Sequence, residues 1–493
     1  MPATTQLLLM EPSLWDGKVY LNTWSKGQAG TATVTDKATG HEIGVVGVAS
    51  VQDIDAACKA AEAAAPAWAA VAPERRAEII RRAGGLLEQY KDEALYWLVR
   101  ESGSTRFKAN IDLQLAIGHF YNSADVALKP TRTVVIDSSE MLSYYDRVPL
   151  GVVGIIGPFN FPLVLDARSL TAALAMGNTV VLKPSLNTAV SGGLIIARIF
   201  EEAGLPQGVL HVLPGEGETG AALVQHPSVA MIAFTGSTEV GKRIGAAAGA
   251  SLKRVSLELG GKNPFIVLEG ADVELAARAG AFGTFLHQGQ ICMTTGLHLV
   301  HESIADAYAD RVASLARELK VGDPWTEAVA LGPIINEKQR DNVMRIIRET
   351  LDCGAKLVEG GTNEGLFVRP TVLKNVPRES PAFREEIFGP VAVIVAYRSE
   401  EEALELANGT GFGLTAAVYG PEETARGIAA RIVSGMVHIN DQTVMEDARV
   451  PFGGTHQSGN SSRIGGPSDL EEYSTFRWTT ETRKPHPYAL PNL

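Results

Sequence analysis

The sequence predicts an α/β fold built on parallel sheets that carry helices on both faces. Two observations lead to this prediction. Between residues 151 and 235, short apolar runs typical of buried strands alternate with helical segments, and this alternation implies βαβ units. After residue 258 the alternation begins again with PFIVL and a long helix from about Asp272 to His287. A chain of 493 residues is long enough for two such domains.

The region before residue 151 has a different pattern. From Ile54 to Val99, apolar residues recur at three- and four-residue spacing, which is typical of packed helices. Two short β-favouring runs follow between residues 134 and 148 and end at Pro149, and another lies at Thr475 to Thr480. These runs predict strands that project from the body, and exposed strand edges need a partner.

Composition excludes several classes of protein. The formal net charge of −12 argues against a nucleic-acid-binding surface, which would concentrate Lys and Arg on one face. No apolar run reaches membrane-spanning length, and residues 1–10 lack the pattern of a secretory signal. The three cysteines are too scattered for a disulfide framework, and none has metal-ligand spacing. We expect a cytoplasmic protein without metal, nucleic-acid or membrane partners.

Three residues have settings that suit catalysis. Cys292, in FLHQGQICMTT, follows a helix in a loop, where a thiol can meet a substrate. Glu258 ends an apolar strand in VSLELGGKNP, where a carboxylate can act as a base on water. Asn160, in GPFNFP, can donate a hydrogen bond to an oxyanion. Taken singly, each also fits a structural alternative, namely an inert thiol, a salt-bridged acid and a turn-forming Asn.

Two further segments suit a nucleotide. VVLKPS places Lys183 at the end of a buried strand, where an ammonium group can contact ribose hydroxyls or phosphate. FTGSTEVG places Gly236, Ser237 and Gly241 between a strand and a helix whose N-terminus can hold a pyrophosphate. The spacing differs from the G-x-G-x-x-G fingerprint, so a helix-capping turn stays open as the alternative.

Taken in their order along the chain, seven segments resemble the aldehyde dehydrogenase superfamily from about residue 20 to about residue 480. The segments are GPFNFP, VVLKPS, FTGSTEVG, LELGGKNP, GQICMTT, EEIFGPV and PFGG. The resemblance implies that Cys292 attacks an aldehyde, and that Asn160 and the Cys292 backbone N–H stabilise the oxyanion. It also implies that hydride passes to NAD and that Glu258 activates the water that hydrolyses the thioester.

The resemblance extends to the cofactor contacts and to the division of the chain. Lys183 is expected to serve both catalysis and cofactor binding, and the other implied contacts are Ser185, Gly236, Ser237, Gly241, Leu259, Glu386 and Phe388. The implied parts are a Rossmann-type dinucleotide-binding domain (1–132 and 150–257), an α/β catalytic domain (258–470) and small oligomerisation strands (133–149 and 471–493). We therefore expect a homodimer or a homotetramer.

One departure from the family concerns the cofactor. Many NAD-preferring relatives carry an acid three residues beyond the strand-end Lys, where it accepts hydrogen bonds from the adenine ribose. Here that position is Leu186. Loss of the carboxylate removes a repulsion against a 2′-phosphate, so we predict that NADP is accepted alongside NAD.

The substrate is an aldehyde, and its class depends on the residues that line the family's substrate funnel. These correspond here to Phe161, Val164, Arg168, Ile291, Met293, Val444 and Phe452. Most are apolar, which favours a hydrophobic or aromatic aldehyde. The stretch VHINDQTVMEDARVPFGG, with Arg168 upstream, resembles the benzaldehyde and vanillin dehydrogenase branch. Two alternatives for Arg168 stay open: it binds the carboxylate of a semialdehyde, or it faces a structural acid.

Two other functions would be compatible with the same fold. A CoA-acylating dehydrogenase would resolve the thioester with a thiol, and Glu258 argues against it because it supplies a base for water. A non-catalytic binding or structural protein on the same fold would have no need to keep Cys292, Glu258 and Asn160 together.

Overall fold

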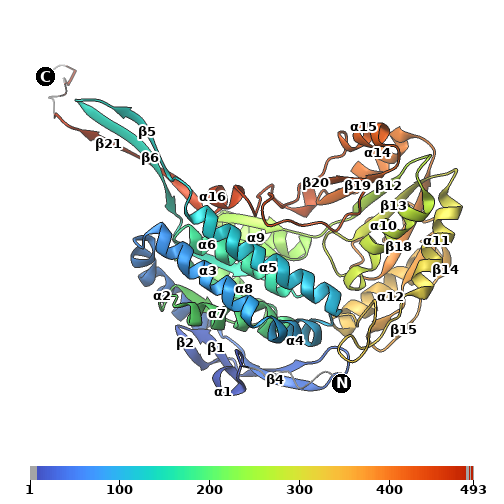
Figure 1. Ribbon diagram of the computed structural model, residues 1–493, viewed down its shortest axis with the longest axis horizontal. Coiled ribbons are helices and arrows are strands. Elements are labelled where there is room, and N and C mark those ends of the chain that lie inside the picture. Colours follow the sequence, from blue (N-terminus) through green and yellow to red (C-terminus); the bar gives the residue numbers. More distant parts are fainter. Residues whose placement is uncertain (1–7, 485–487, 489, 492–493) are drawn as a thin grey trace.

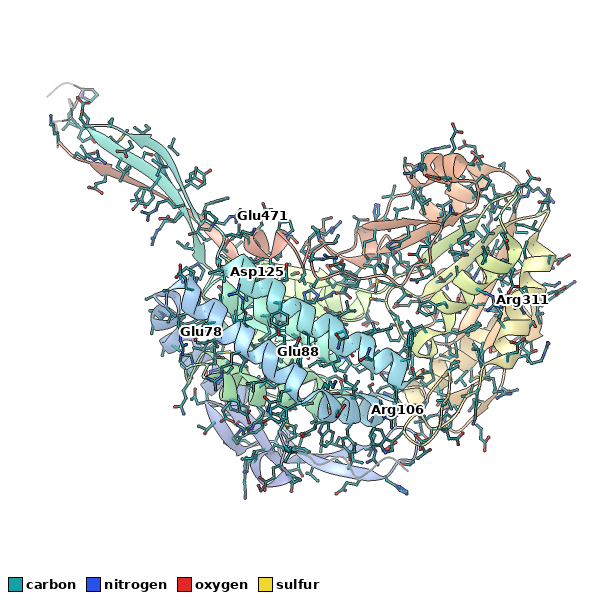
Figure 2. All side chains as sticks on the ribbon, viewed as in Figure 1. Glu78, Glu88, Arg106, Asp125, Arg311 and Glu471 are labelled. Carbon is teal, nitrogen blue, oxygen red and sulfur yellow. The ribbon has the colours of Figure 1, made fainter. Side chains whose placement is uncertain are left out.

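The computed structural model describes residues 8–484, 488 and 490–491. Two seven-stranded sheets, each covered by helices, form the body, and a three-stranded sheet projects from it as a long arm (Figure 1). Arg106 lies where the N-terminal helices meet the second sheet's half of the body (Figure 2). Its guanidinium carbon lies 4.4 Å from the centre of the Trp325 ring, which contributes to the contact between the two halves.

The segment predicted to be helical folds as three helices, α2 (Val51–Ala69), α3 (Pro73–Gln89) and α4 (Lys91–Ser102). The longer helix α5 (Arg106–Ala127) follows them. Gly103 ends α4 because its φ of 70° lies in the left-handed region that glycine adopts without strain. The described residues before α2, from residue 8 on, form one short helix and four strands: α1 (Pro12–Trp15), β1 (Lys18–Leu21), β2 (Thr23–Lys26), β3 (Thr31–Thr35) and β4 (Glu42–Gly47).

The first large sheet has the strand order β11-β10-β7-β8-β9-β1-β2. The five strands from the β11 edge to β9 are parallel, which confirms the βαβ prediction. These strands are β7 (Val152–Ile156), β8 (Thr179–Lys183), β9 (Leu210–Val212), β10 (Val229–Thr235) and β11 (Arg254–Glu258). The helices between them are α6 (Pro162–Ala175), α7 (Ile195–Ala203), α8 (Gly217–Gln225) and α9 (Thr238–Ala250), with the short turns η1 (Leu186–Thr188) and η2 (Val190–Leu194) before α7.

Strand register brings the predicted functional positions to one edge of this sheet. Ile156 pairs with Lys183, and Thr235 pairs with Glu258. Each of these residues lies at the carboxyl end of its strand, which is the edge where α/β sheets bind ligands. The turn that carries Asn160 leaves the sheet at the same edge, directly after β7.

The second large sheet has the order β14-β17-β18-β13-β12-β19-β20. Successive residues of β12 point to opposite faces, so that Phe265 packs in one apolar cluster and Ile266 in another. The strands are β12 (Asn263–Val267), β13 (Thr295–His301), β14 (Lys356–Glu359), β17 (Thr371–Lys374), β18 (Val391–Tyr397), β19 (Thr415–Tyr419) and β20 (Met436–Ile439). The helices are α10 (Val273–Phe285), α11 (Ala305–Glu318), α12 (Glu337–Asp352), α13 (Pro381–Arg384), α14 (Glu400–Asn408) and α15 (Glu422–Ala429).

Helix α10 ends two residues before the predicted end near His287. His287 and Gln288 have φ values of 51° and 56°, which no α-helix can contain, and the turn η3 (Leu286–Gly289) replaces the last helical residues. The remaining elements are β15 (Asn363–Glu364), β16 (Phe367–Val368), η4 (His456–Ser458) and α16 (Ser468–Glu472).

The arm consists of β5 (Arg132–Asp137), β6 (Met141–Pro149) and β21 (Ser474–Thr482), in the order β21-β6-β5. The predicted strands at 134–148 and 475–480 are thus present and antiparallel. The arm exposes large apolar side chains, among them Val135 at 59% and Trp478 at 74%. The predicted tail segment 471–493 extends beyond β21, and its residues 485–487, 489, 492 and 493 lie outside the described residues.

Within the described ranges, no helix is long and apolar enough to cross a membrane. In the same ranges, no group of three or more His, Cys, Asp or Glu side chains is placed to hold a metal ion.

Candidate active site

The loop that carries Cys292 is held from several sides. The side-chain amide of Asn263, at the start of β12, donates to the carbonyl oxygens of Cys292 at 2.7 Å and Thr294 at 2.8 Å. The hydroxyl of Thr443 donates to the carbonyl of Met293 at 2.7 Å. These bonds anchor three consecutive carbonyls and fix the position of the half-buried thiol.

The turn that carries Asn160 rests on a buried ion pair. The Lys108 ammonium donates to the Asn160 carbonyl at 2.5 Å and to Asp112 at 3.0 Å. Asp112 in turn accepts the backbone N–H of Val164 at 2.9 Å. Lys108 and Asp112 are fully buried on α5. Helix α5 therefore holds both ends of the Asn160 turn, and the sequence pattern did not single out this pair.

Cys292 and Asn160 line one cavity of about 230 Å³. Five of the seven predicted funnel residues line it with them, namely Phe161, Ile291, Met293, Val444 and Phe452. The sequence analysis missed the other lining residues, which are Ile111, Leu115, Leu165, Phe282, Leu286, Gln442, Met445 and Glu446. The walls are mostly apolar, so the cavity suits a hydrophobic aldehyde.

Val164 and Arg168 are not part of this lining. Val164 is fully buried in the apolar core, because the neighbouring position Leu165 is the one that α6 turns toward the cavity. Arg168 is also fully buried, and its Nη1 donates to Glu446 at 3.2 Å. Its guanidinium lies 4.5 Å from the centre of the Phe452 ring. Arg168 thus pairs with an acid of the protein itself, as in the second of the two alternatives.

Glu258 lies at the end of β11 with both carboxylate oxygens buried and unpartnered among the described residues. A Cβ atom at Gly453 would lie 2.7 Å from Glu258 Oε1, so glycine at this position leaves room for the carboxylate. Burial raises the pKa of Glu258 to about 8, against the opposing charges of Arg168 and Arg463. A carboxylate with a pKa near neutral can accept a proton from water.

The surroundings of Cys292 favour the protonated thiol. Burial raises its pKa to about 12, and the positive charge of Arg168 only partly opposes the shift. The thiol must therefore lose its proton to a base during the reaction, because only the thiolate is a strong nucleophile.

Glu386 and Phe388 lie beside the Cys292 loop. Glu386 Oε1 accepts the backbone N–H of Gly261 at 3.1 Å, and a Cβ atom at Gly261 would lie 2.6 Å from the Cys292 carbonyl. The Phe388 ring packs edge-on against Phe159, with 5.8 Å between ring centres. Burial raises the pKa of Glu386 to about 7. Glu386 and Phe388 are thus near both the thiol and the Asn160 turn.

A second cavity, of about 550 Å³, lies at the carboxyl edge of the first sheet between α8 and α9. Lys183 is the predicted cofactor residue that lines it. The other lining residues are Ile156, Gly217, Gly220, Ala221, Val224, Gln225, Val240, Arg243, Ile244 and Ala247. This apolar slot with one buried ammonium has the form expected for a nucleotide. The sequence analysis did not predict Arg243.

The slot is not lined by the predicted cofactor residues Ser185, Gly236, Ser237, Gly241 and Leu259. The backbone N–H of Gly236 donates to the Glu258 carbonyl at 3.0 Å, and Ser237 precedes the first residue of α9. A Cβ atom at Gly241 would overlap Leu259, so these two residues are in contact. Ser185 caps η1 by accepting the backbone N–H of Asn187.

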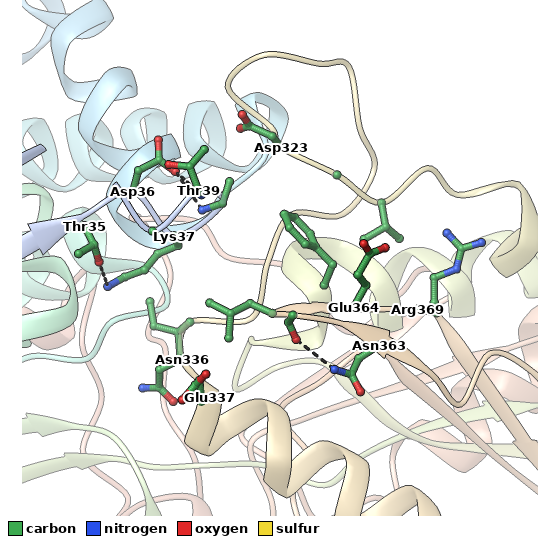
Figure 3. Close-up of a pocket in the computed structure, with 18 of the residues that line it drawn as sticks. Thr35, Asp36, Lys37, Thr39, Asp323, Asn336, Glu337, Asn363, Glu364 and Arg369 are labelled. Carbon is green, nitrogen blue, oxygen red and sulfur yellow. Dashed lines mark hydrogen bonds between the residues drawn. The ribbon is translucent and has the colours of Figure 1, made fainter. Parts of the chain in front are cut away.

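A larger cavity, of about 1050 Å³, opens elsewhere, between the loop at residues 35–40 and the segment at 362–369 (Figure 3). Lys37 donates to the Thr35 hydroxyl at 3.2 Å, and Asn363 donates to the Gly365 carbonyl at 3.0 Å. Its lining contains no residue with a predicted catalytic or cofactor role. Size alone therefore does not locate the chemistry in this molecule.

The aldehyde dehydrogenase family model matches residues 24–479. The chain belongs to the aldehyde dehydrogenase family. The match confirms the family and the fold class that the seven segments predicted. Cys292 and Asn160 line one of the two cavities described above, and Lys183 lines the other.

Several known members of the aldehyde dehydrogenase family are similar to this chain over most of their length. A vanillin dehydrogenase of Amycolatopsis sp. is 49% identical over 96% of this chain and 97% of its own. A benzaldehyde dehydrogenase [NAD(+)] of Pseudomonas putida is 45% identical over 97% of this chain and 99% of its own. The NAD+ complex structure of an aldehyde dehydrogenase from Bacillus cereus has a TM-score of 0.91 at 34% identity, covering 95% and 97%.

Proposed function

We propose that this chain oxidises aromatic aldehydes of the benzaldehyde or vanillin type to carboxylic acids with NAD. The observation that carries the proposal is the cavity that holds Cys292 and Asn160 between apolar and aromatic walls. Similarity to a vanillin dehydrogenase and a benzaldehyde dehydrogenase [NAD(+)], at 49% and 45% identity, supports the same substrate class.

In the proposed reaction, the Cys292 thiol gives up its proton to solvent. The resulting thiolate sulfur attacks the aldehyde carbon, and the aldehyde oxygen becomes an oxyanion. The Asn160 side chain and the Cys292 backbone N–H donate hydrogen bonds to it. NAD, when bound, supplies the hydride acceptor that turns the thiohemiacetal into a thioester. Glu258 then takes a proton from the water that attacks the thioester, and the carboxylic acid leaves as the C–S bond breaks.

The residues of the nucleotide slot fit NAD. Among the described residues, the Lys183 ammonium donates only to the Pro184 carbonyl, at 3.3 Å, so its other protons are available for ribose hydroxyls. Ile156 and Val240 provide apolar walls for a flat ring. Glu386 and Phe388 are proposed to contact the nicotinamide end, because both lie beside the Cys292 loop.

NADP is proposed as a second cofactor. Leu186 offers no carboxylate to repel a 2′-phosphate, and Arg243 lines the slot. The Arg243 side chain is 70% exposed and lies 3.9 Å from Glu239. Because such an exposed ion pair is weak, Arg243 can bind a phosphate instead. Initial rates with the two cofactors test this proposal, and strong exclusion of NADP would contradict it.

The alternative functions are less well supported. Arg168 already pairs with Glu446, so a semialdehyde carboxylate would have to compete with a buried acid. The CoA-acylating alternative leaves the buried Glu258 without a role.

The experiment that tests the proposal measures NADH formation with benzaldehyde, vanillin, hexanal and succinic semialdehyde. We expect aromatic aldehydes to have the highest kcat/KM. The Cys292→Ala variant should be inactive, whereas Cys353→Ala, which changes an exposed cysteine, should retain wild-type rates. A preference for hexanal or succinic semialdehyde would contradict the proposed substrate class, and an active Cys292→Ala variant would contradict the mechanism.

A further inference from the structure

The substrate cavity has polar side chains in two places. Cys292 and Asn160 form the reacting end, and the other polar lining residues in the described chain are Gln442 and Glu446, from the loop after β20. The side-chain amide of Gln442 is already bonded to the backbone of Val444 through both its nitrogen and its oxygen. Glu446 is therefore the polar group that remains available to a substrate.

Glu446 carries a carboxylate with one engaged oxygen. Oε1 lies 3.2 Å from Arg168 Nη1 and 3.4 Å from His119 Nε2. The hydrogen bonds of this carboxylate to described residues are made by Oε1, and the side chain is 5% exposed. Although burial acts to raise its pKa, Arg168 and His119 hold the pKa of Glu446 below the usual value. Glu446 thus places a charged oxygen acceptor in the cavity lining, where it is paired with a buried cation.

The aldehydes that give the two similar relatives their names differ in whether they can donate a hydrogen bond to such an acceptor. Vanillin carries a ring hydroxyl, which can donate a hydrogen bond, and benzaldehyde does not. A site with a buried acceptor discriminates strongly against a substrate that leaves the acceptor unpaired. The walls of the same cavity include Phe161 and Phe452, which suit an aromatic ring.

We propose that Glu446 is a specificity-determining residue that accepts a hydrogen bond from the phenolic hydroxyl of hydroxylated benzaldehydes and repels aldehydes that carry a carboxylate. This inference rests on the proposed function and adds the preferred subclass of substrate. Arg168 holds Glu446 in place and is neutralised by it.

Arg168 would have the opposite effect on substrate preference if Glu446 lost its charge. Its Nε and Nη2 are buried and have no hydrogen-bond partner among the described side chains and backbone. Loss of the charge on Glu446 would leave this guanidinium as the dominant charge at that end of the cavity. The cavity would then change from accepting a hydroxyl to attracting a carboxylate.

The test compares kcat/KM for benzaldehyde, 3-hydroxybenzaldehyde, 4-hydroxybenzaldehyde and 4-carboxybenzaldehyde. For the wild type, we expect the better hydroxylated substrate to exceed benzaldehyde by about tenfold or more, the size of one charge-assisted hydrogen bond. Glu446→Gln should lower that ratio by about tenfold and raise the ratio of 4-carboxybenzaldehyde to benzaldehyde. A general defect would lower all rates together and leave both ratios unchanged.

Asp447→Asn is the matched control, because it makes the same chemical change at the next residue, which does not line this cavity. Its ratios should equal those of the wild type. Inhibition of the wild type by 4-hydroxybenzamide and by benzamide gives a measurement that needs no variant, and we expect about tenfold tighter inhibition by the hydroxylated amide.

The outcomes separate this inference from the proposed function. Oxidation of benzaldehyde and both hydroxybenzaldehydes at equal kcat/KM, or unchanged ratios in Glu446→Gln, would overturn the role of Glu446 and leave the aromatic class intact. Failure to oxidise any benzaldehyde, while hexanal is oxidised, would overturn the proposed function itself.

Discussion

At the scale of single residues, burial favours the protonated, uncharged forms of Glu258 and Cys292. Burial raises the pKa of Glu258 to about 8 and that of Cys292 to about 12, so both groups hold their protons near neutral pH. The sequence indicated these residues because they stand in distinctive segments. It could not indicate their protonation, because the burial comes from segments far away in the chain, such as Gly453 beside Glu258.

The pH dependence of turnover follows from Glu258. A base acts only when it is ionised, and an acid with a raised pKa ionises above that value. Where hydrolysis of the thioester limits the rate, we expect kcat to rise with pH and level off above about 8. Steady-state rates at saturating aldehyde between pH 6 and 10 measure this, and a kcat already constant at pH 6 would contradict the raised pKa.

Glu258→Gln should separate hydride transfer from hydrolysis. The variant keeps the thiol and the Asn160 side chain, so the thioester still forms. We expect a burst of NADH equal to the number of sites, followed by steady-state turnover reduced about 10²- to 10⁴-fold. Rapid mixing with NADH absorbance measures both phases. Glu302→Gln, at an exposed position, is the control and should turn over normally, whereas undiminished turnover in Glu258→Gln would exclude the base role.

At the scale of elements, the strands and helices around the sheets were predictable because their patterns are local. The βαβ units, the arm strands and the helix before Cys292 all followed from apolar spacing over short windows. The contacts that support the site were not predictable in this way. Lys108 reaches the Asn160 carbonyl across 52 positions of sequence, and a lysine on a helix gives no sign that it is buried.

The Lys108–Asp112 pair gives a prediction for helix α5. Removing one member of a buried ion pair leaves the other charged and unpaired, so Lys108→Met should lower the free energy of unfolding by about 3–5 kcal/mol. Loss of the bond to the Asn160 carbonyl should also lower kcat. Urea unfolding and steady-state rates measure these effects.

Two further variants serve as controls for Lys108→Met. Lys59→Met removes a lysine from an exposed pair of the same helical spacing, and its effect on stability should stay below about 1 kcal/mol. Lys108→Met/Asp112→Leu should recover part of the stability without recovering kcat. A double variant with wild-type kcat would show that the pair does not position Asn160.

At the scale of the whole molecule, the arm is the feature that a lone chain does not explain. Strands β5 and β21 form the two edges of its sheet, and every residue of β5 is exposed. Exposed edges with large apolar side chains tend to pair with another chain. The sequence predicted the strands and their projection from the body. It could not predict that β21 pairs with β6, because these strands lie far apart in the chain.

We propose that the arm joins subunits, as the family resemblance implies, and that Val135→Glu/Trp478→Glu yields a monomer. Charges at two positions exposed by 59% and 74% would be buried without partners in an interface, which is costly. Sedimentation velocity measures the change in mass. Leu252→Glu is the matched control, because Leu252 is 95% exposed but lies outside the arm, and it should keep the wild-type mass. A wild-type protein that already sediments as a monomer, or a double variant that keeps the wild-type mass, would contradict this role of the arm.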